Sequence, residues 1–191
     1  ALDVTNREQL VRMLEANTMD MVLMGPPPEG LEVESEAFMD NPLVIVAPPE
    51  HPLAGAREVP LARLAQEVFV MREPGSGTRL VMDRFFSDQG IAIQRGMQMT
   101  RNEAIKQSVR AGLGLSLISL HSIELELATG KLVVLDVIGL PIQHQWYLVY
   151  RRGKRLSPSA WAFREFVLAE AGRLATGTAS WPPSRGGQLI R

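Results

Sequence analysis

The sequence predicts an α/β protein, and two observations carry that prediction. Short apolar runs end at glycine or proline, as buried strands do, and amphipathic stretches with apolar residues at helical spacing separate them. Strands and helices that alternate in this way favour parallel β-α-β units. The chain has 191 residues, of which 46% are hydrophobic, so it can bury a core as one domain or as two small ones.

The expected helices follow from caps and periodicity. Asn6 is a suitable N-cap, after which Leu10, Val11 and Leu14 recur at helical spacing through Ala16. Later helices are recognised in the same way, by an opening cap or proline and by a closing glycine. The expected helices lie at residues 7–16, 61–65, 78–89, 102–112, 123–128 and from 158 onward.

Strands are expected where apolar and β-branched residues cluster. The run at 21–24, for example, ends at Gly25 and three prolines, which cannot continue inside a sheet. The expected strands lie at residues 21–24, 31–39, 43–47, 68–70, 97–100, 115–119, 132–138 and 146–150. After residue 171 Gly, Ser, Thr and Pro dominate, so residues 172–191 are expected to form a disordered tail.

Composition excludes several classes of function. The formal charge of −1 argues against bulk nucleic-acid binding, and the absence of cysteine excludes disulfides and thiolate metal sites. No apolar stretch approaches the roughly 20 residues of a membrane span. Residues 1–20 carry no signal-peptide pattern, and the chain does not begin with Met. We therefore expect a cytoplasmic protein without a membrane partner, present here as a fragment or a processed product.

The segment Val68 to Arg79 is the most informative stretch of the chain. A β-branched and aromatic run enters a loop with Gly75, Ser76 and Gly77, and Thr78 stands where a helix would begin. Small hydroxyls and backbone N–H groups at a helix N-terminus suit an anion, to which Arg79 would add charge. Taken alone, the loop is better explained as a structural glycine turn with a helix cap than as a binding site. The spacing matches neither a Walker loop nor a dinucleotide fingerprint.

A second junction repeats this pattern. Thr100, Arg101 and Asn102 follow an expected strand and open an expected helix, which by itself indicates a cap. Asn6 and Gly25 are two further positions of this kind. Caps at the carboxyl ends of neighbouring strands would face one crevice, where open α/β sheets bind ligands.

No catalytic or metal constellation is visible. His51, His121 and His144 are scattered, and none has the spacing of a metal-binding pair. Ser76 lacks the elbow motif of serine hydrolases, and no nucleophile–base pair can be argued. We therefore predict no enzyme, no catalytic residue, no metal and no cofactor.

Six motifs in a fixed order carry a family resemblance that covers nearly all of residues 2–171. They are Asn6-Arg7-Glu8, Asp20-Met21-Val22-Leu23-Met24, Pro42-Leu43-Val44-Ile45-Val46 with His51-Pro52-Leu53-Ala54, Arg72-Glu73-Pro74-Gly75-Ser76-Gly77-Thr78-Arg79, Asn102-Glu103-Ala104-Ile105-Lys106 through Gly112-Leu113-Gly114, and Gly130-Lys131-Leu132. In this order the chain resembles the effector-binding domain of LysR-type transcriptional regulators. The amino-acid sequence of residues 112–118 and 145–150 is most similar to that of the CbbR branch, which regulates carbon-fixation operons.

The resemblance implies a type 2 periplasmic-binding-protein-like fold. Two α/β subdomains would be joined by two crossover strands, with the effector between them. Subdomain I would take residues 1–42 and 146–171, and subdomain II residues 43–145. The first strand and helix of this fold would be expected before Ala1, and their absence would put effector binding and the usual dimer in doubt. By matching motifs, the effector would contact Asn6, Gly25, Ser76, Gly77, Thr78, Arg79, Arg101 and Asn102.

The resemblance also implies a function. The chain would sense a small anionic, phosphorylated metabolite and thereby modulate transcription. It would self-associate as a dimer or tetramer in the full-length parent, and DNA would be bound only through an N-terminal domain absent from this chain. The alternative is a solute-binding protein of the same fold that serves a transporter, against which the missing signal peptide argues.

Overall fold

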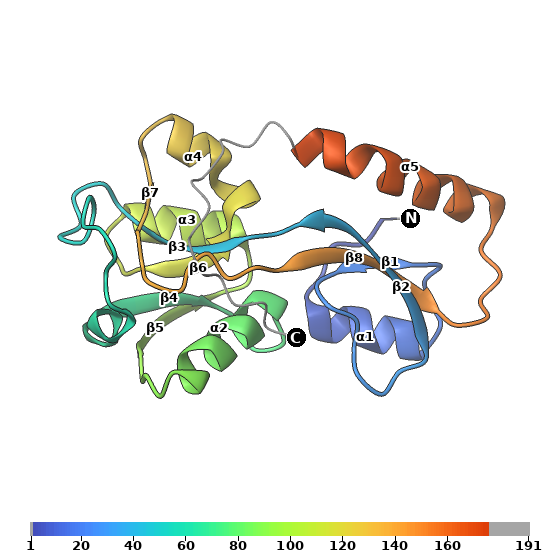
Figure 1. The fold of residues 1–191 in the computed structure, drawn as a ribbon. Helices are drawn as coiled ribbons and strands as arrows, with labels where there is room; N and C mark the ends of the chain where they lie inside the picture. The colour runs from blue at the N-terminus through green and yellow to red at the C-terminus, as the bar shows by residue number, and fades with distance from the viewer. Residues whose placement is uncertain (1, 176–191) are drawn as a thin grey trace. The chain divides into compact units, whose positions relative to one another are not determined.

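The computed structural model describes residues 2–175, and they divide into two units. Unit 1 contains residues 2–41 and 144–175, and unit 2 contains residues 42–143. The chain therefore passes from one unit to the other twice, at residues 41–42 and 143–144 (Figure 1). These crossings lie within a few residues of the boundaries expected from the resemblance.

Unit 1 is a three-stranded antiparallel sheet with a helix on each face. Its elements are α1 (Arg7–Glu15), β1 (Val22–Met24), β2 (Val33–Asp40), β8 (Gln145–Arg151) and α5 (Pro158–Ala175), and the strand order is β1-β8-β2. Val149 of β8 packs with Leu14 of α1, whereas its neighbours Leu148 and Tyr150 pack with Val167 of α5. Side chains alternate between the faces of a strand, so β8 holds both helices (Figure 1).

Unit 2 is built on two smaller sheets that are joined edge to edge. Its elements are β3 (Leu43–Ala47), η1 (Leu61–Gln66), β4 (Val68–Arg72), α2 (Gly77–Asp88), β5 (Gln94–Met99), α3 (Asn102–Arg110), β6 (Ser116–Ser119), η2 (Leu120–Ile123), α4 (Glu124–Ala128) and β7 (Val133–Val134). The sheets are β6-β3-β7 and β4-β5. Leu115 donates to the carbonyl of Val68 and accepts from Val70, both at 2.8 Å, which gives the order β5-β4-β6-β3-β7.

The faces of this sheet are covered by different helices. Leu43, Ile45 and Phe69 face the core that contains Phe86 of α2. Val44, Val46 and Val70 face the opposite core, which contains the α3 residues Ile105 and Val109. The alternation along β3 and β4 therefore places α2 and α3 on opposite faces (Figure 1).

The expectation of parallel strands was right for part of unit 2 and wrong for the other strand pairs. The β4–β5 pair and the bridge between Phe69 and Leu115 are parallel, but β1–β8, β2–β8, β3–β6 and β3–β7 are antiparallel. Alternation of elements along the chain does not fix which distant strand becomes a neighbour. The expected strand at 132–138 is paired only as β7, and Val137 then bridges to Val59 outside the sheet.

The expected N-cap of α1 agrees with the structure, whereas the expected start of α2 and the expected N-cap of α3 differ from it. The Asn6 cap is confirmed, since its side chain accepts a hydrogen bond from the N–H of Gln9 at 3.1 Å. Helix α2 begins at Gly77 with Ser76 as its N-cap, not at Thr78, and α3 has Arg101 at the N-cap in place of Asn102. Helix α5 continues to Ala175, past residue 171, whereas residues 176–191 of the expected tail lie outside the described part.

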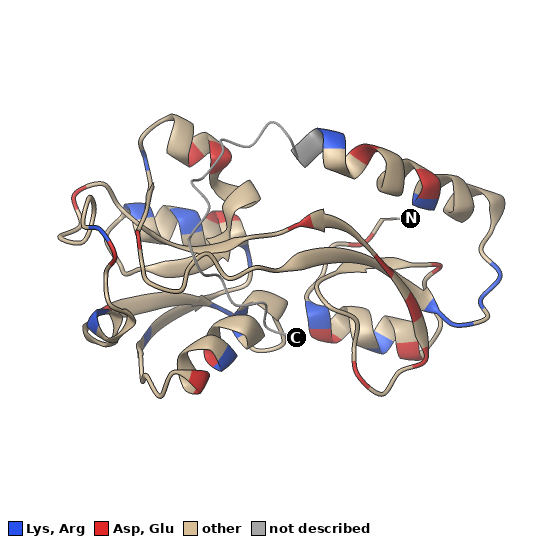
Figure 2. Ribbon diagram, viewed as in Figure 1, with Lys and Arg blue, Asp and Glu red and all other residues tan. Residues whose placement is uncertain are grey.

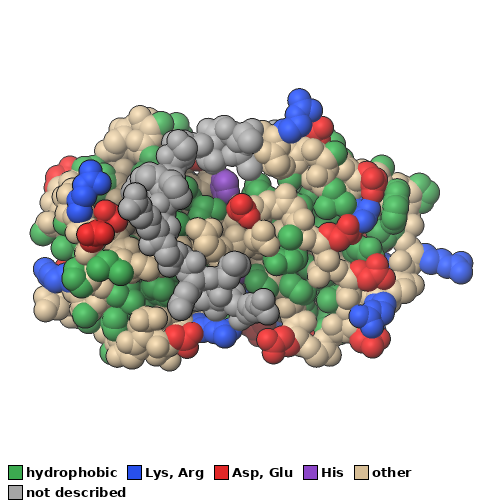
Figure 3. All heavy atoms as spheres, in the orientation of Figure 1, with side chains coloured by type: hydrophobic (Ala, Val, Ile, Leu, Met, Phe, Trp, Pro, Cys, Tyr) green, Lys and Arg blue, Asp and Glu red, His purple; other side chains and the backbone are tan. Residues whose placement is uncertain are grey.

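Within the described residues, no helix is both long enough and apolar enough to cross a membrane. Figure 2 shows charged residues of both signs scattered along the ribbon, and Figure 3 shows their side chains interspersed among hydrophobic ones on one face. This mixture agrees with the formal charge of −1.

Candidate functional site

The carboxyl ends of three strands meet at one edge of unit 2. Strand β4 runs parallel to β5, and also to the segment that enters β6 at Leu115. A helical segment begins after each of them: α2 after β4, α3 after β5 and η2 after β6. This edge therefore brings together the predicted residues Ser76, Thr78, Arg101 and Asn102, as expected for a ligand-binding edge of an α/β sheet.

The N-terminus of α2 has backbone N–H groups that no side chain of the described residues caps. The carbonyl of Ser76 accepts the first helical hydrogen bond, from Leu80 at 3.0 Å, but no side chain caps the helix. The N–H groups of Gly77, Thr78 and Arg79 in the first turn have no partner within a helix. Ser76 itself is buried, with 3% of its surface exposed. Donors of this kind, at the positive end of a 12-residue helix, suit an anion.

Arg79 was expected to add a free positive charge at this edge, but its guanidinium is already paired. Its Nε lies 2.6 Å from Oδ2 of Asp83, and its Nη1 donates to the carbonyl of Arg72 at 3.1 Å. Its side chain is only 8% exposed. The Asp83 carboxylate at i+4 offsets the charge, so Arg79 holds the end of β4 against α2 and is not available as a free cation.

Sequence reasoning missed a network that joins the strand ends. Arg72 forms two hydrogen bonds with the carboxylate of Glu73, at 2.8 and 3.1 Å, and a third with Oδ1 of Asn102 at 2.9 Å. The amide of Asn102 in turn donates to the hydroxyl of Ser122 at 3.4 Å. Asn102 is therefore a link between β4, α3 and η2. The adjacent opposite charges of Arg72 and Glu73 at a strand end were the available signal.

Arg101 is the predicted cation that stays unpaired. It is exposed at the N-cap of α3, and the described part of the chain offers it no ion pair or side-chain hydrogen bond. An exposed guanidinium beside a helix N-terminus attracts anions to this edge.

The two remaining predicted residues lie in unit 1. Asn6 caps α1, and Gly25 directly follows β1. Arg7, the first residue of α1, donates from Nη1 to the carbonyl of Pro26 at 2.5 Å, which brings the helix start next to the turn after β1. A Cβ at Gly25 would lie 2.7 Å from Nε2 of His144, so the imidazole occupies the space of a side chain. Sequence reasoning missed both Arg7 and His144 as members of this cluster.

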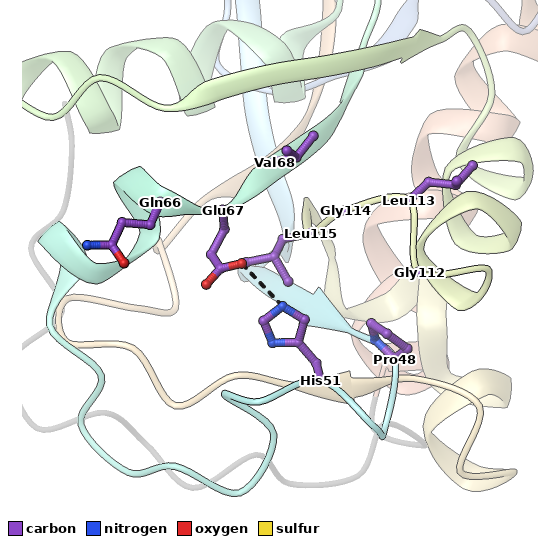
Figure 4. Close-up of a pocket in the computed structure, with 9 residues that line it drawn as sticks. All are labelled: Pro48, His51, Gln66, Glu67, Val68, Gly112, Leu113, Gly114 and Leu115. Carbon is purple, nitrogen blue, oxygen red and sulfur yellow. Dashed lines mark ion pairs between the residues drawn. The ribbon is translucent and has the colours of Figure 1, made fainter.

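A separate pocket lies at the other end of β4. It has a volume of about 250 Å³ and is lined by Pro48, His51, Gln66, Glu67, Val68, Gly112, Leu113, Gly114 and Leu115 (Figure 4). Nε2 of His51 lies 3.4 Å from Oε2 of Glu67, and Nδ1 accepts from the N–H of Leu53 at 3.2 Å. Because the pocket is at the start of β4, it is distinct from the edge that follows Arg72, and it contains none of the predicted effector residues.

The fold and this edge define a ligand-binding regulatory domain, and the comparisons give its family. The model of the LysR substrate-binding domain matches residues 1–172, and the chain belongs to that family. The expected type 2 periplasmic-binding-protein-like fold is thereby confirmed, as is the expectation of a regulatory domain without enzymatic function.

Individual relatives are consistent with the CbbR branch. The chain is 70% identical over 173 residues to a RuBisCO operon transcriptional regulator of Allochromatium vinosum, with 91% of the chain and 57% of the relative covered. It is 45% identical over 173 residues to the regulator CbbR of Rhizobium meliloti, with 90% and 55% covered. The chain thus spans little more than half the length of these curated relatives.

A solved structure is similar at the level of both sequence and fold. The regulatory domain of CcmR from Synechocystis PCC6803, in complex with 2-PG, is 37% identical and superposes with a TM-score of 0.85. The match covers 88% of this chain and 81% of that one. Together with the regulators above, it favours the regulator over a transport protein of the same fold.

Proposed function

We propose that the chain is the sensing domain of a CbbR-like regulator of carbon-fixation genes and that it binds a small anionic, phosphorylated metabolite. The observation that carries this proposal is the uncapped N-terminus of α2 at the carboxyl edge of unit 2. The 2-PG complex of the CcmR domain supports it, because that ligand was found on a domain of the same fold.

A phosphate group fits the chemistry of this edge. The first-turn N–H groups of α2 and the hydroxyls of Ser76 and Thr78 donate hydrogen bonds, and the helix dipole favours negative charge. Arg101 adds an exposed positive charge. Each hydrogen bond to a charged group contributes about 1.5–3 kcal/mol. The Arg72–Asn102 link holds the two helix starts in place for this contact.

In the complete regulator, ligand binding at this domain would alter how the oligomer holds its DNA in the cytoplasm. We assign the DNA contacts to a part of the protein outside these 191 residues, because the chain spans little more than half the length of relatives that are named as transcriptional regulators. Self-association of the domains would transmit the change. The position of the effector between two subdomains stays a prediction of the family resemblance.

The experiment that tests the proposal is calorimetric titration of Thr78→Val with 2-PG. Loss of the hydroxyl should weaken binding by about tenfold, or 1.4 kcal/mol, with little change in melting temperature. Thr129→Val is the matched control, because it also replaces a threonine hydroxyl by a methyl group. The hydroxyl of Thr129 lies at the C-terminal end of α4 and donates only to backbone carbonyls. Unchanged affinity in Thr78→Val, or a large loss of melting temperature with no loss of affinity, would contradict the proposal.

A further inference from the structure

Two basic side chains flank the turn that follows β1 in unit 1. On one side, Arg7 donates from Nη1 to the carbonyl of Pro26 at 2.5 Å. On the other, the His144 ring lies against Gly25, with Nε2 at 2.7 Å and Cε1 at 3.5 Å from the place of a Cβ. Gly25 does not adopt a positive φ. The glycine is therefore required by the imidazole and not by the backbone.

No carboxylate offsets either group. Within residues 2–175, Arg7 and His144 form no ion pair with an aspartate or a glutamate. Burial lowers the pKa of Arg7, and burial, followed by the positive charge of Arg7, lowers the pKa of His144. The turn thus carries two half-buried basic groups that repel each other when both are charged.

Other shielded arginines of the chain differ from Arg7 in having a carboxylate partner. Three of them each face a carboxylate: Arg72 with Glu73, Arg79 with Asp83, and Arg164 with Glu36. Burying a guanidinium without such a partner is costly. If Arg7 served only to hold the turn, one N–H would suffice. Its contact with Pro26 leaves the Nε and Nη2 groups for a planar, two-point contact with an oxyanion.

We propose that Arg7 and His144 form an anion-binding site on unit 1, which holds a phosphate or carboxylate group of a small metabolite, and that Gly25 keeps open the space in which His144 is seated. The site deepens the proposed function and rests on it, because the ligand belongs to the same class of anionic metabolite. Arg7 and His144 are the binding residues of this site, and Gly25 is its positioning residue.

Mutants of the 191-residue chain test this site with sulfate and with 2-PG as probes. Arg7→Gln should weaken the affinity for both by about tenfold, measured by calorimetry, whereas Arg7→Lys should retain part of it. Arg12→Gln is the matched control. It removes the same charge from the same helix, but Arg12 is exposed and pairs with Glu8, so its effect should stay within about twofold.

Gly25→Ala and His144→Gln give a second arm that does not touch Arg7. A methyl group at position 25 should displace the imidazole without straining the backbone, so both variants should weaken anion binding several-fold while circular dichroism shows a folded chain. Sulfate keeps its charge between pH 5.5 and 8. Its affinity should therefore rise toward low pH in the parent chain and rise less in His144→Gln, with Arg7 as the charged neighbour whose field acts on His144.

NMR titration of the histidine imidazoles shows where sulfate binds. Sulfate should raise the pKa of His144, whereas the imidazole resonances of His51, which faces Glu67 at the far end of β4, should not shift when sulfate is added. Unchanged affinity in Arg7→Gln and Gly25→Ala would overturn the site even if Thr78→Val weakens binding, in which case the proposed function stands. If Arg7→Gln weakens the affinity for the anions and Thr78→Val does not, the result supports the site on unit 1 and contradicts anion binding at the edge of unit 2. A chain that binds neither probe contradicts both.

Discussion

Arg72 donates a hydrogen bond of 2.9 Å to the side-chain oxygen of Asn102, and this contact joins the end of β4 to the start of α3. Arg72 is also held by Glu73, and Asn102 also reaches Ser122. The polar edge of unit 2 is therefore a connected network and not a set of separate helix caps. Its connection predicts how the edge responds to substitution.

Asn102→Ala should destabilise the chain by about 1–2 kcal/mol, because it leaves a shielded N–H of Arg72 without its acceptor. Urea unfolding followed by circular dichroism measures this change. Gln107→Ala is the control on the same helix, since Gln107 is exposed and bonds only to other side chains of α3. Equal effects of the two substitutions would contradict the role of Asn102 as a link.

Arg79→Gln should lower stability more than it lowers ligand affinity. The buried guanidinium holds both Asp83 and the carbonyl of Arg72, and its loss should cost about 2–3 kcal/mol. Arg84→Gln, whose exposed ion pair with Asp88 spans 3.7 Å, should cost less than about 0.5 kcal/mol. A large loss of 2-PG affinity at unchanged melting temperature would instead restore Arg79 as a direct ligand.

Stability should fall at acidic pH in a way that depends on His144. Burial and the charge of Arg7 lower its pKa in the folded chain below the ordinary value of about 6.5. The unfolded chain therefore binds the proton more tightly, so the free energy of unfolding decreases as the pH falls below about 6.5, until the folded pKa is passed. Unfolding curves at pH 8 and pH 5 should differ less in His144→Gln. An identical difference in both proteins would refute this assignment.

Gly114→Ala should be among the most damaging single changes in unit 2. Its φ is +147°, and a Cβ there would lie 2.5 Å from the carbonyl oxygen of Val68, next to the hydrogen bonds that join β4 to β6. We expect a loss of about 3 kcal/mol in urea unfolding. At Gly112 the φ is +74° and a Cβ would meet nothing within 4 Å, so Gly112→Ala should cost only about 1 kcal/mol. The reverse order of these losses would contradict the close approach.

Local chemistry explains why parts of the site could be predicted. The Asn6 cap depends on a hydrogen bond to Gln9, three residues away, and the placement of Ser76 and Thr78 at a helix start depends on the strand and helix patterns around them. These are short-range effects that composition and spacing reveal. The exposed position of Arg101 follows in the same way from its place between β5 and α3.

The sequence by itself determined the α/β class, most of the elements, the family and the segments that carry polar groups at strand ends. Only the tertiary structure decided the antiparallel strand directions, the pairing of Arg79 with Asp83, and the contact of His144 with Gly25. The reason is physical. Periodicity and capping act within a few residues, whereas strand direction, burial and the partner of a charge depend on which distant segments folding brings together.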